Sequence, residues 1–208
     1  MTRRSIFASL TLVAAMVLSL GFSIRSAEAA SPAEQFIADN VQKGMAILNN
    51  TASSKELRKS QFQDFLLSLT DIQSIGRYTL GQYRRSAPPE DLAAFDLAFK
   101  DYAMSVYQSY FAKYSGQTLK VTGSNALGPN DTMVKTVTVD PKKSSAKPYE
   151  VNFRVQTVNG RMVVVDFSVE GVWIRELERN DFTSYLGQKN GDVKALIAML
   201  HQKAAQQK

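Results

Sequence analysis

Residues 149–169, which read YEVNFRVQTVNGRMVVVDFSV, are the stretch of sequence that decides the fold. Apolar and polar residues alternate from Tyr149 to Gln156, and a period of two predicts a strand with one covered face and one wet face. The strand is expected to run to Val158, and a second strand follows over Met162–Val169, after the turn-forming pair Asn159-Gly160. The stretch therefore predicts an antiparallel hairpin.

Two registers of this hairpin are compatible with the Asn159-Gly160 pair. A two-residue turn sets Phe153 opposite Asp166, whereas a three-residue loop with Gly160 in the left-handed conformation sets Phe153 opposite Val165. We favour the three-residue loop, because it places four apolar residues of the second strand on the covered face: Val163, Val165, Phe167 and Val169.

The hairpin is the end of a longer meander. Strands are also expected over Thr118–Ser124 and Met133–Val139, with turns at Asn130-Asp131 and Asp140-Pro141. Outside these four strands the apolar spacing is helical, and we expect helices over residues 32–48, 55–69, 71–80, 176–185 and 192–206, with a long helix starting at Pro88-Pro89. The layout is α+β, with helices packed on one face of a curved four-stranded antiparallel sheet.

Composition excludes several kinds of chemistry. The 208 residues contain no cysteine and one histidine, His201, so disulfides, thiolate nucleophiles, iron–sulfur clusters and His-rich metal sites are excluded. Lys and Arg number 25 against 19 Asp and Glu, which gives a formal charge of +6. A basic exported protein is expected to meet an anionic surface or an acidic partner rather than nucleic acid.

Residues 1–29 are expected to be a secretory signal peptide. Arg3 and Arg4 precede an apolar core over Leu10–Leu20, and Ala27-Glu28-Ala29 is a small-x-small cleavage site. An uncleaved membrane anchor over Ile6–Ile24 is the competing interpretation. Cleavage would leave residues 30–208 as a single exported domain.

Two stretches resemble one known family. The first is Tyr78-Thr79-Leu80-Gly81-Gln82-Tyr83-Arg84-Arg85 with aromatic residues downstream, and the second is Asp166-Phe167-Ser168-Val169-Glu170-Gly171-Val172 followed by Arg179 and Phe182. Both are similar to stretches of the MlaC family, also called the toluene-tolerance family. Met162, Trp173 and Leu177-Glu178 depart from the family pattern.

The resemblance implies a periplasmic phospholipid carrier of NTF2-like shape, with acyl chains in an apolar cavity between the helices and the sheet. It implies shuttling between an outer-membrane lipoprotein–porin complex and an inner-membrane ABC transporter that bears an MCE-domain protein, which maintains outer-membrane lipid asymmetry. Some relatives accompany hopanoid genes, so a hopanoid-associated carrier stays an alternative. The resemblance implies no enzyme activity, no cofactor and no metal.

The same resemblance implies a set of lipid-binding residues. They are Leu80, Phe99, Val106, Tyr110, Val151, Phe153, Val155, Val163, Val165, Phe167, Val169, Phe182 and Leu196. Basic residues are expected to contact a partner or the lipid phosphate, at Arg84-Arg85 and at Lys142-Lys143.

Two titratable residues have an alternative interpretation. Asp166, among valines, could be the general base of a small isomerase or dehydratase with a cone-shaped cavity, but no second catalytic partner is identifiable. A hydrogen-bonded structural role is therefore favoured for Asp166. For His201, near the end of the last helix, we favour a surface position.

Overall fold

The computed structural model describes residues 30–114, 116–142 and 147–206, with the backbone alone for residues 107–113. Its elements are, in chain order, α1 (Pro32–Leu48), α2 (Lys55–Leu69), α3 (Ile72–Thr79), the 3₁₀ helix η1 (Gly81–Arg85), α4 (Pro89–Lys113), β1 (Thr118–Gly128), β2 (Asp131–Val139), β3 (Glu150–Val158), β4 (Arg161–Val169), β5 (Val172–Trp173), α5 (Ile174–Gln188) and α6 (Val193–Gln206). The predicted α+β class with an antiparallel sheet is confirmed, but the sheet has five strands rather than four, because Val172–Trp173 adds a short strand that the sequence pattern did not predict.

The helices begin where side chains satisfy free backbone N–H groups. Ser31, Ser54 and Asp71 each accept a hydrogen bond from the backbone N–H three residues later, at 3.0–3.2 Å. Helix α5 differs, because its N-cap residue Trp173 makes no such bond. None of the helices in the described ranges is long and apolar enough to cross a membrane.

The sheet is an antiparallel meander in the order β1-β2-β3-β4-β5. The favoured hairpin register is wrong. Asn159 and Gly160 both have positive φ angles, 51° and 76°, and form a two-residue turn that pairs Val158 with Arg161. A bulge in β4 then shifts the register by one residue, so that Phe153 lies opposite Phe167 rather than Val165 or Asp166.

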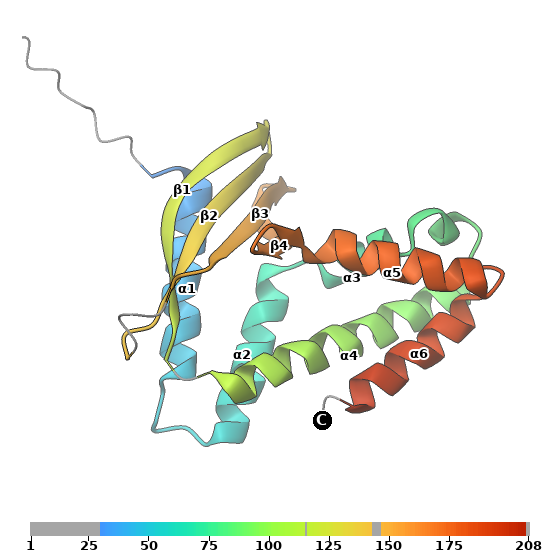
Figure 1. The fold of residues 1–208 in the computed structure, drawn as a ribbon, viewed down its shortest axis with the longest axis horizontal. Coiled ribbons are helices and arrows are strands. Elements are labelled where there is room, and N and C mark those ends of the chain that lie inside the picture. The colour runs from blue at the N-terminus through green and yellow to red at the C-terminus, as the bar shows by residue number, and fades with distance from the viewer. Residues whose placement is uncertain (1–29, 115, 143–146, 207–208) are drawn as a thin grey trace, which may run out of the picture.

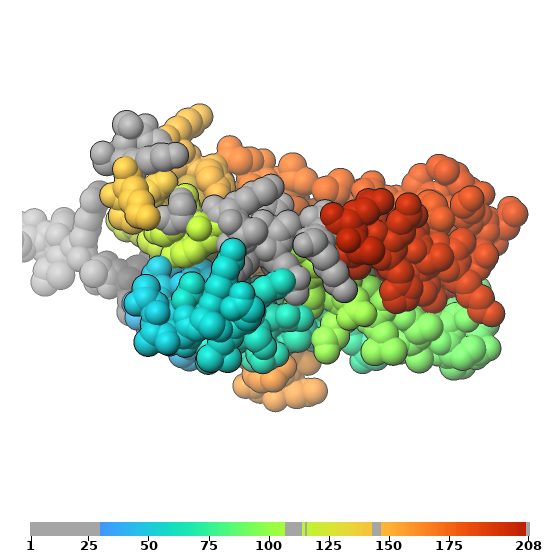
Figure 2. Space-filling view, turned by 90° about the horizontal axis from the view of Figure 1, so that it is seen from below, coloured from blue at the N-terminus to red at the C-terminus, as the bar shows by residue number. Residues whose placement is uncertain are grey.

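Helix α1 and the sheet lie toward one end of the molecule, and α5 and α6 lie toward the other (Figures 1 and 2). Each end has its own hydrophobic cluster. The first joins the helices α3, α4, α5 and α6, and its centre is formed by Leu80, Phe95, Phe99, Phe182, Leu186, Leu196 and Leu200. The second joins α1 to the sheet through Ala33, Ile37, Val134, Val155 and Val164. Since the two clusters share no described residue, the helical end and the sheet end are packed separately.

Gly81 sets the junction between α3 and η1. Its φ angle is +56°, in the left-handed region, and a Cβ at this position would lie 2.7 Å from Cγ2 of Thr183 in α5. Leu80, the residue before it, is fully buried. The Leu80-Gly81 pair therefore allows the chain to turn while α5 packs directly on the turn.

Candidate functional site

One face of the sheet lies under α1, and we call it the α1 face. Four cross-strand rows define it, because residues paired directly across antiparallel strands point to the same side. From one end to the other the rows are Leu119–Thr138, then Val121–Thr136–Val151–Val169, then Ser124–Val134–Phe153–Phe167, then Ala126–Thr132–Val155–Val164. The face is apolar apart from short hydroxyl side chains.

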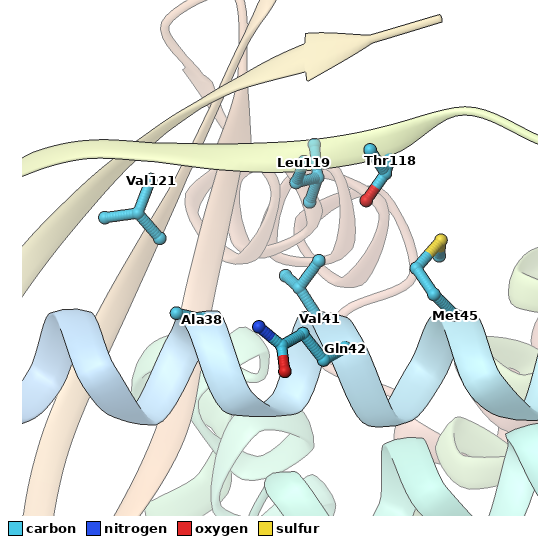
Figure 3. Close-up of a pocket in the computed structure, with 7 residues that line it drawn as sticks. All are labelled: Ala38, Val41, Gln42, Met45, Thr118, Leu119 and Val121. Carbon is cyan, nitrogen blue, oxygen red and sulfur yellow. The ribbon is translucent and has the colours of Figure 1, made fainter. Parts of the chain in front are cut away.

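The two halves of α1 pack differently on this face. Ala33 and Ile37, in the first half, are buried against Val134, Val155 and Val164. The second half leaves a pocket of about 480 Å³ between the helix and β1 (Figure 3). Its wall consists of Ala38, Val41, Gln42, Met45, Thr118, Leu119 and Val121. The pocket therefore lies on the α1 face, at the end of the sheet where the first two rows run.

The residue after α4 lies next to this region. Tyr114, just after the helix, donates its hydroxyl toward Sδ of Met45 at 3.3 Å and toward Oδ1 of Asn49 at 3.4 Å. Met45 itself lines the pocket. The C-terminal end of α1, the end of α4 and the start of β1 thus lie close together.

Helix α2 adds apolar side chains that are not fully buried. It packs against α1 at Gly44, where an added Cβ would lie 3.1 Å from the ring of Phe65. None of the fifteen residues of α2 is buried, although the helix carries Phe62, Phe65, Leu66, Leu67 and Leu69. These five apolar side chains are partly buried, so α2 is packed less completely than the helices of the helical cluster.

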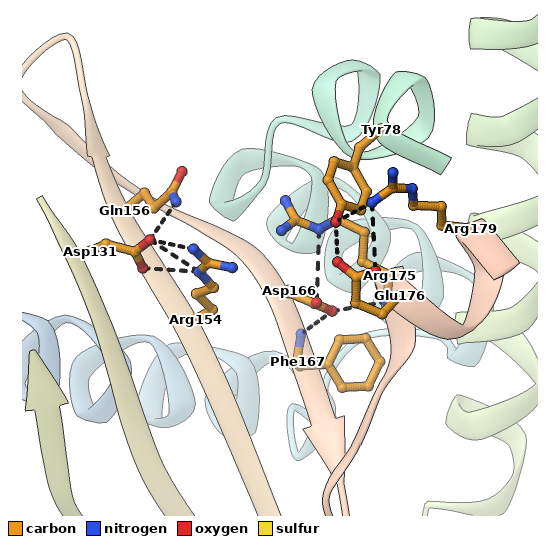
Figure 4. Close-up of polar contacts among 9 residues, drawn as sticks. All are labelled: Tyr78, Asp131, Arg154, Gln156, Asp166, Phe167, Arg175, Glu176 and Arg179. Atoms are coloured by element: carbon orange, nitrogen blue, oxygen red, sulfur yellow. Dashed lines mark hydrogen bonds and ion pairs between the residues drawn. The ribbon is translucent and has the colours of Figure 1, made fainter. Parts of the chain in front are cut away.

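The opposite face of the sheet is polar and is held by ion pairs (Figure 4). Arg154 donates to both carboxylate oxygens of Asp131, at 3.0 Å from Nε and 2.6 Å from Nη2, and Gln156 Nε2 donates to the same carboxylate at 2.7 Å. The hydrogen bonds from Arg154 hold the pKa of Asp131 below its usual value, against the opposite effect of burial. This arrangement links β2 to β3.

Asp166 caps α5 from the neighbouring strand. Its Oδ1 accepts the backbone N–H groups of Arg175 at 2.9 Å and of Phe167 at 2.8 Å, and Oδ2 lies 3.8 Å from Nε of Arg175. Burial raises the pKa of Asp166, while the hydrogen bond from the Arg175 backbone and the charge of Arg175 act in the other direction. The carboxylate thus supplies the cap that Trp173 does not, which is the structural role favoured from the sequence.

Tyr78 ties α3 to α5 beside this cap. The guanidinium carbons of Arg175 and Arg179 lie 4.1 Å and 4.9 Å from the centre of its ring, and Arg179 Nη1 donates to its hydroxyl at 3.0 Å. The Tyr78 hydroxyl also donates to Glu176. Arginines and carboxylates balance in this cluster, so it is a structural junction rather than an anion-binding site.

The described residues contain no group of three or more His, Asp or Glu side chains that could hold a metal ion. His201 is exposed on α6, as expected.

Comparison with known proteins now bears on this geometry. The family model described as "MlaC protein" matches residues 38–202. The chain belongs to the MlaC family. A solved structure from Ralstonia solanacearum, described as a phospholipid-binding protein in complex with a phospholipid, is similar with a TM-score of 0.73 and 19% identity. The match covers 85% of this chain and 99% of the Ralstonia chain, so this MlaC-family member shares its fold.

The α1 face collects five of the residues that the resemblance predicted. Val151, Phe153, Val155, Phe167 and Val169 lie in adjacent rows of this face. Val163 and Val165 do not join them, because Val163 pairs with Gln156 on the opposite face and Val165 is the extra residue of the bulge. The physical reason is the register shift, which moves the residues before the bulge by one position.

Four other predicted residues belong to the helical cluster instead. Leu80, Phe99, Phe182 and Leu196 are buried against one another and their neighbours, and Val106 packs at the edge of the same cluster. Phe99 lies directly over Gly76 of α3, where an added Cβ would be 2.6 Å from its ring. The side chain of Tyr110 lies outside the described residues.

The predicted basic residues are exposed where they are described. Arg84 and Arg85 end η1, and Asp91 pairs with Lys194 at 3.7 Å rather than with either arginine. Lys142 lies in the turn after β2, while Lys143 and the expected signal peptide 1–29 lie outside the described residues.

Sequence reasoning missed the α1 and β1 walls of the pocket. Val41 and Met45 were recognisable as the apolar stripe of a helix, and Leu119 and Val121 as alternate residues of a strand. Periodicity indicates that such residues are covered by another element. It does not show that α1 and β1 are separated by a pocket.

Proposed function

We propose that this protein is a periplasmic lipid carrier that moves phospholipid between the outer and inner membranes as the soluble component of an Mla-type ABC transport system. In this role it would maintain outer-membrane lipid asymmetry. Membership of the MlaC family supports the carrier role, and the phospholipid held by the Ralstonia structure supports the class of ligand. The basis for residues 1–29 as a signal peptide and 30–208 as one lipid-binding domain is the sequence pattern.

The observation that carries the proposal is the pocket that separates the second half of α1 from the α1 face of the sheet. The pocket there is lined mainly by apolar side chains, and Val121 in its wall belongs to the same row of the α1 face as Val151 and Val169. Each buried methylene contributes about 0.8 kcal/mol, so two acyl chains in this region would leave for water very slowly. Transfer then needs a docked membrane partner, so that the lipid does not cross bulk water.

An enzyme of similar shape is less well supported. The carboxylate that could serve as a general base, Asp166, has its acceptor positions directed to backbone N–H groups and to Arg175. It also lies on the face of the sheet opposite Phe153 and Val151, since it pairs with Arg154. A base held in this way does not reach a ligand in the α1 pocket.

We expect the protein, purified without detergent, to carry phospholipid. Native mass spectrometry should show a complex heavier than the mature chain, and solvent extraction followed by lipid mass spectrometry should identify glycerophospholipid. Hopanoid masses in the extract would instead support the hopanoid-associated carrier. Protein that is lipid-free in several independent preparations, including preparations from the native host, would contradict the proposal.

The proposed partners are the outer-membrane lipoprotein–porin complex and the MCE-domain protein of the inner-membrane transporter. Arg84 and Arg85 are exposed at the tip of the helical end, beyond the buried Leu80. Exposed charges of this kind speed a reversible encounter with an acidic rim more than they tighten it.

The double change Arg84→Glu, Arg85→Glu is therefore expected to slow lipid transfer to the MCE-domain protein by about tenfold, with the bound lipid unchanged. Stopped-flow transfer at low and high salt measures this, since the wild-type rate should fall with salt and the variant rate should not. A matched control is Lys55→Glu, Lys59→Glu on α2, which has the same charge change elsewhere. Equal transfer rates for wild type and the Arg84/Arg85 variant would place the docking surface elsewhere.

A further inference from the structure

The pocket under α1 has a polar residue, Thr118, at one end. Thr118 lines it at the start of β1 and pairs with Val139, the last residue of β2, and its hydroxyl is directed toward α1 (Figure 3). Gln42 contributes the other polar side chain of the wall. The remaining lining residues are Ala38, Val41, Met45, Leu119 and Val121, so the pocket suits a molecule with an apolar body and a polar end.

A turn after β2 holds a lysine beside this polar end. The backbone N–H of Lys142 donates to Oδ1 of Asp140 at 2.9 Å, and Oδ2 of Asp140 accepts from Nε2 of Gln117 at 3.3 Å. Asp140 therefore joins the turn to the segment that leads into Thr118. The Lys142 side chain extends over Gly116, where its Nζ lies 3.9 Å from the position that a Cβ would take.

The Lys142 ammonium is left without an acidic partner in the described part of the chain. The five ion pairs found there use other lysines and arginines, and the Asp140 carboxylate is already bound to the Lys142 backbone and to Gln117. Lys142 is exposed, so its charge faces solvent at the pocket end. The ammonium lies over Gly116, two residues before Thr118, and so adds a positive charge near the end of the pocket that Thr118 lines.

We propose that Lys142 binds the phosphate of the lipid headgroup at the Thr118 end of the pocket, and so makes the site selective for phosphate-bearing lipids. This inference rests on the proposed function. A lipid whose acyl chains follow the α1 face has its headgroup at the pocket opening. A compact ammonium on a flexible stem attracts phosphate as a point charge and does not require one fixed headgroup shape.

The test compares two lipids that differ in the phosphate. Delipidated wild type and Lys142→Glu are titrated with dioleoylphosphatidylglycerol and with dioleoylglycerol, which has the same chains and no phosphate. We expect Lys142→Glu to weaken phosphatidylglycerol binding about fivefold, as for an exposed charge pair, and to leave dioleoylglycerol binding unchanged. Lys142→Arg should keep the wild-type preference, and the effect should shrink at 1 M salt.

Lys120→Glu is the matched control, because Lys120 is an exposed residue between Leu119 and Val121 that does not line the pocket. This variant carries the same charge change on β1 and is expected to change the binding of neither lipid. Equal phosphatidylglycerol binding by wild type and Lys142→Glu would overturn the proposal, and so would an equal loss of both lipids. A wild type that binds dioleoylglycerol but not phosphatidylglycerol would also overturn it, whereas uptake of neither lipid would overturn the proposed function itself.

Discussion

Phe167→Asp is expected to reduce the phospholipid retained after purification to less than about a tenth of the wild-type level, because an unpaired carboxylate among acyl chains costs several kcal/mol. Phe167 lies opposite Phe153 on the α1 face and is only partly buried. The measurement is the lipid-to-protein ratio from solvent extraction, with circular dichroism and thermal unfolding to establish that the variant is folded.

A second variant and a control test whether the loss of lipid is specific to the α1 face. Val151→Asp changes the neighbouring row, Thr136–Val151–Val169, and should have the same effect on bound lipid. Val158→Asp introduces the same charge at the exposed end of β3, on the other face of the strand, and should leave lipid in place. Full loading of folded Phe167→Asp and Val151→Asp proteins would show that the lipid does not contact the α1 face.

The second large effect concerns stability. Asp166→Ala removes the acceptor for the first turn of α5 and leaves Arg175, whose side chain is only 13% exposed, without its ion-pair partner. Breaking a buried ion pair in this way costs about 3 to 5 kcal/mol in the free energy of unfolding. Urea denaturation followed by tryptophan fluorescence measures it, since Trp173, the single tryptophan, is adjacent to the cap.

Asp166→Asn separates the contribution of the helix cap from that of the ion pair with Arg175. The amide oxygen can still accept the backbone N–H of Arg175, but the charge opposite the guanidinium is lost, so the loss of stability should be smaller than for alanine. Asp64→Ala, an exposed carboxylate on α2, should change the unfolding free energy by no more than about 0.5 kcal/mol. An Asp166→Ala protein as stable as the Asp64→Ala protein would refute the capping role.

Local signals in the sequence were sufficient for the longer helices and strands. Helix α1 starts at Pro32 after the cap Ser31, and β3 follows the alternation from Val151 to Val155, because both depend on nearest neighbours along the chain. The short strand Val172–Trp173 was missed because two residues carry no period. Its existence depends on pairing with Ser168 and Val169 of β4.

The partners of the apolar faces could not be predicted in the same way. Phe99 and Phe182 have the spacing of a buried helix face, but nothing in that spacing tells whether they meet the sheet or other helices. The structure places them in the helical cluster, away from Phe153. The register of β4 could not be predicted either, because an Asn-Gly turn specifies the loop but not a bulge five residues later.

The bulged residue Val165 also sets a rule for aligning this chain with its relatives. Before it, the even-numbered Met162 and Val164 face α1, and after it the odd-numbered Phe167 and Val169 do. A relative with one residue fewer in this strand would have the same two halves with no bulge, so an alignment gap belongs at position 165. Aligning the strand without that gap would compare side chains from opposite faces and would make conserved positions of the α1 face look variable.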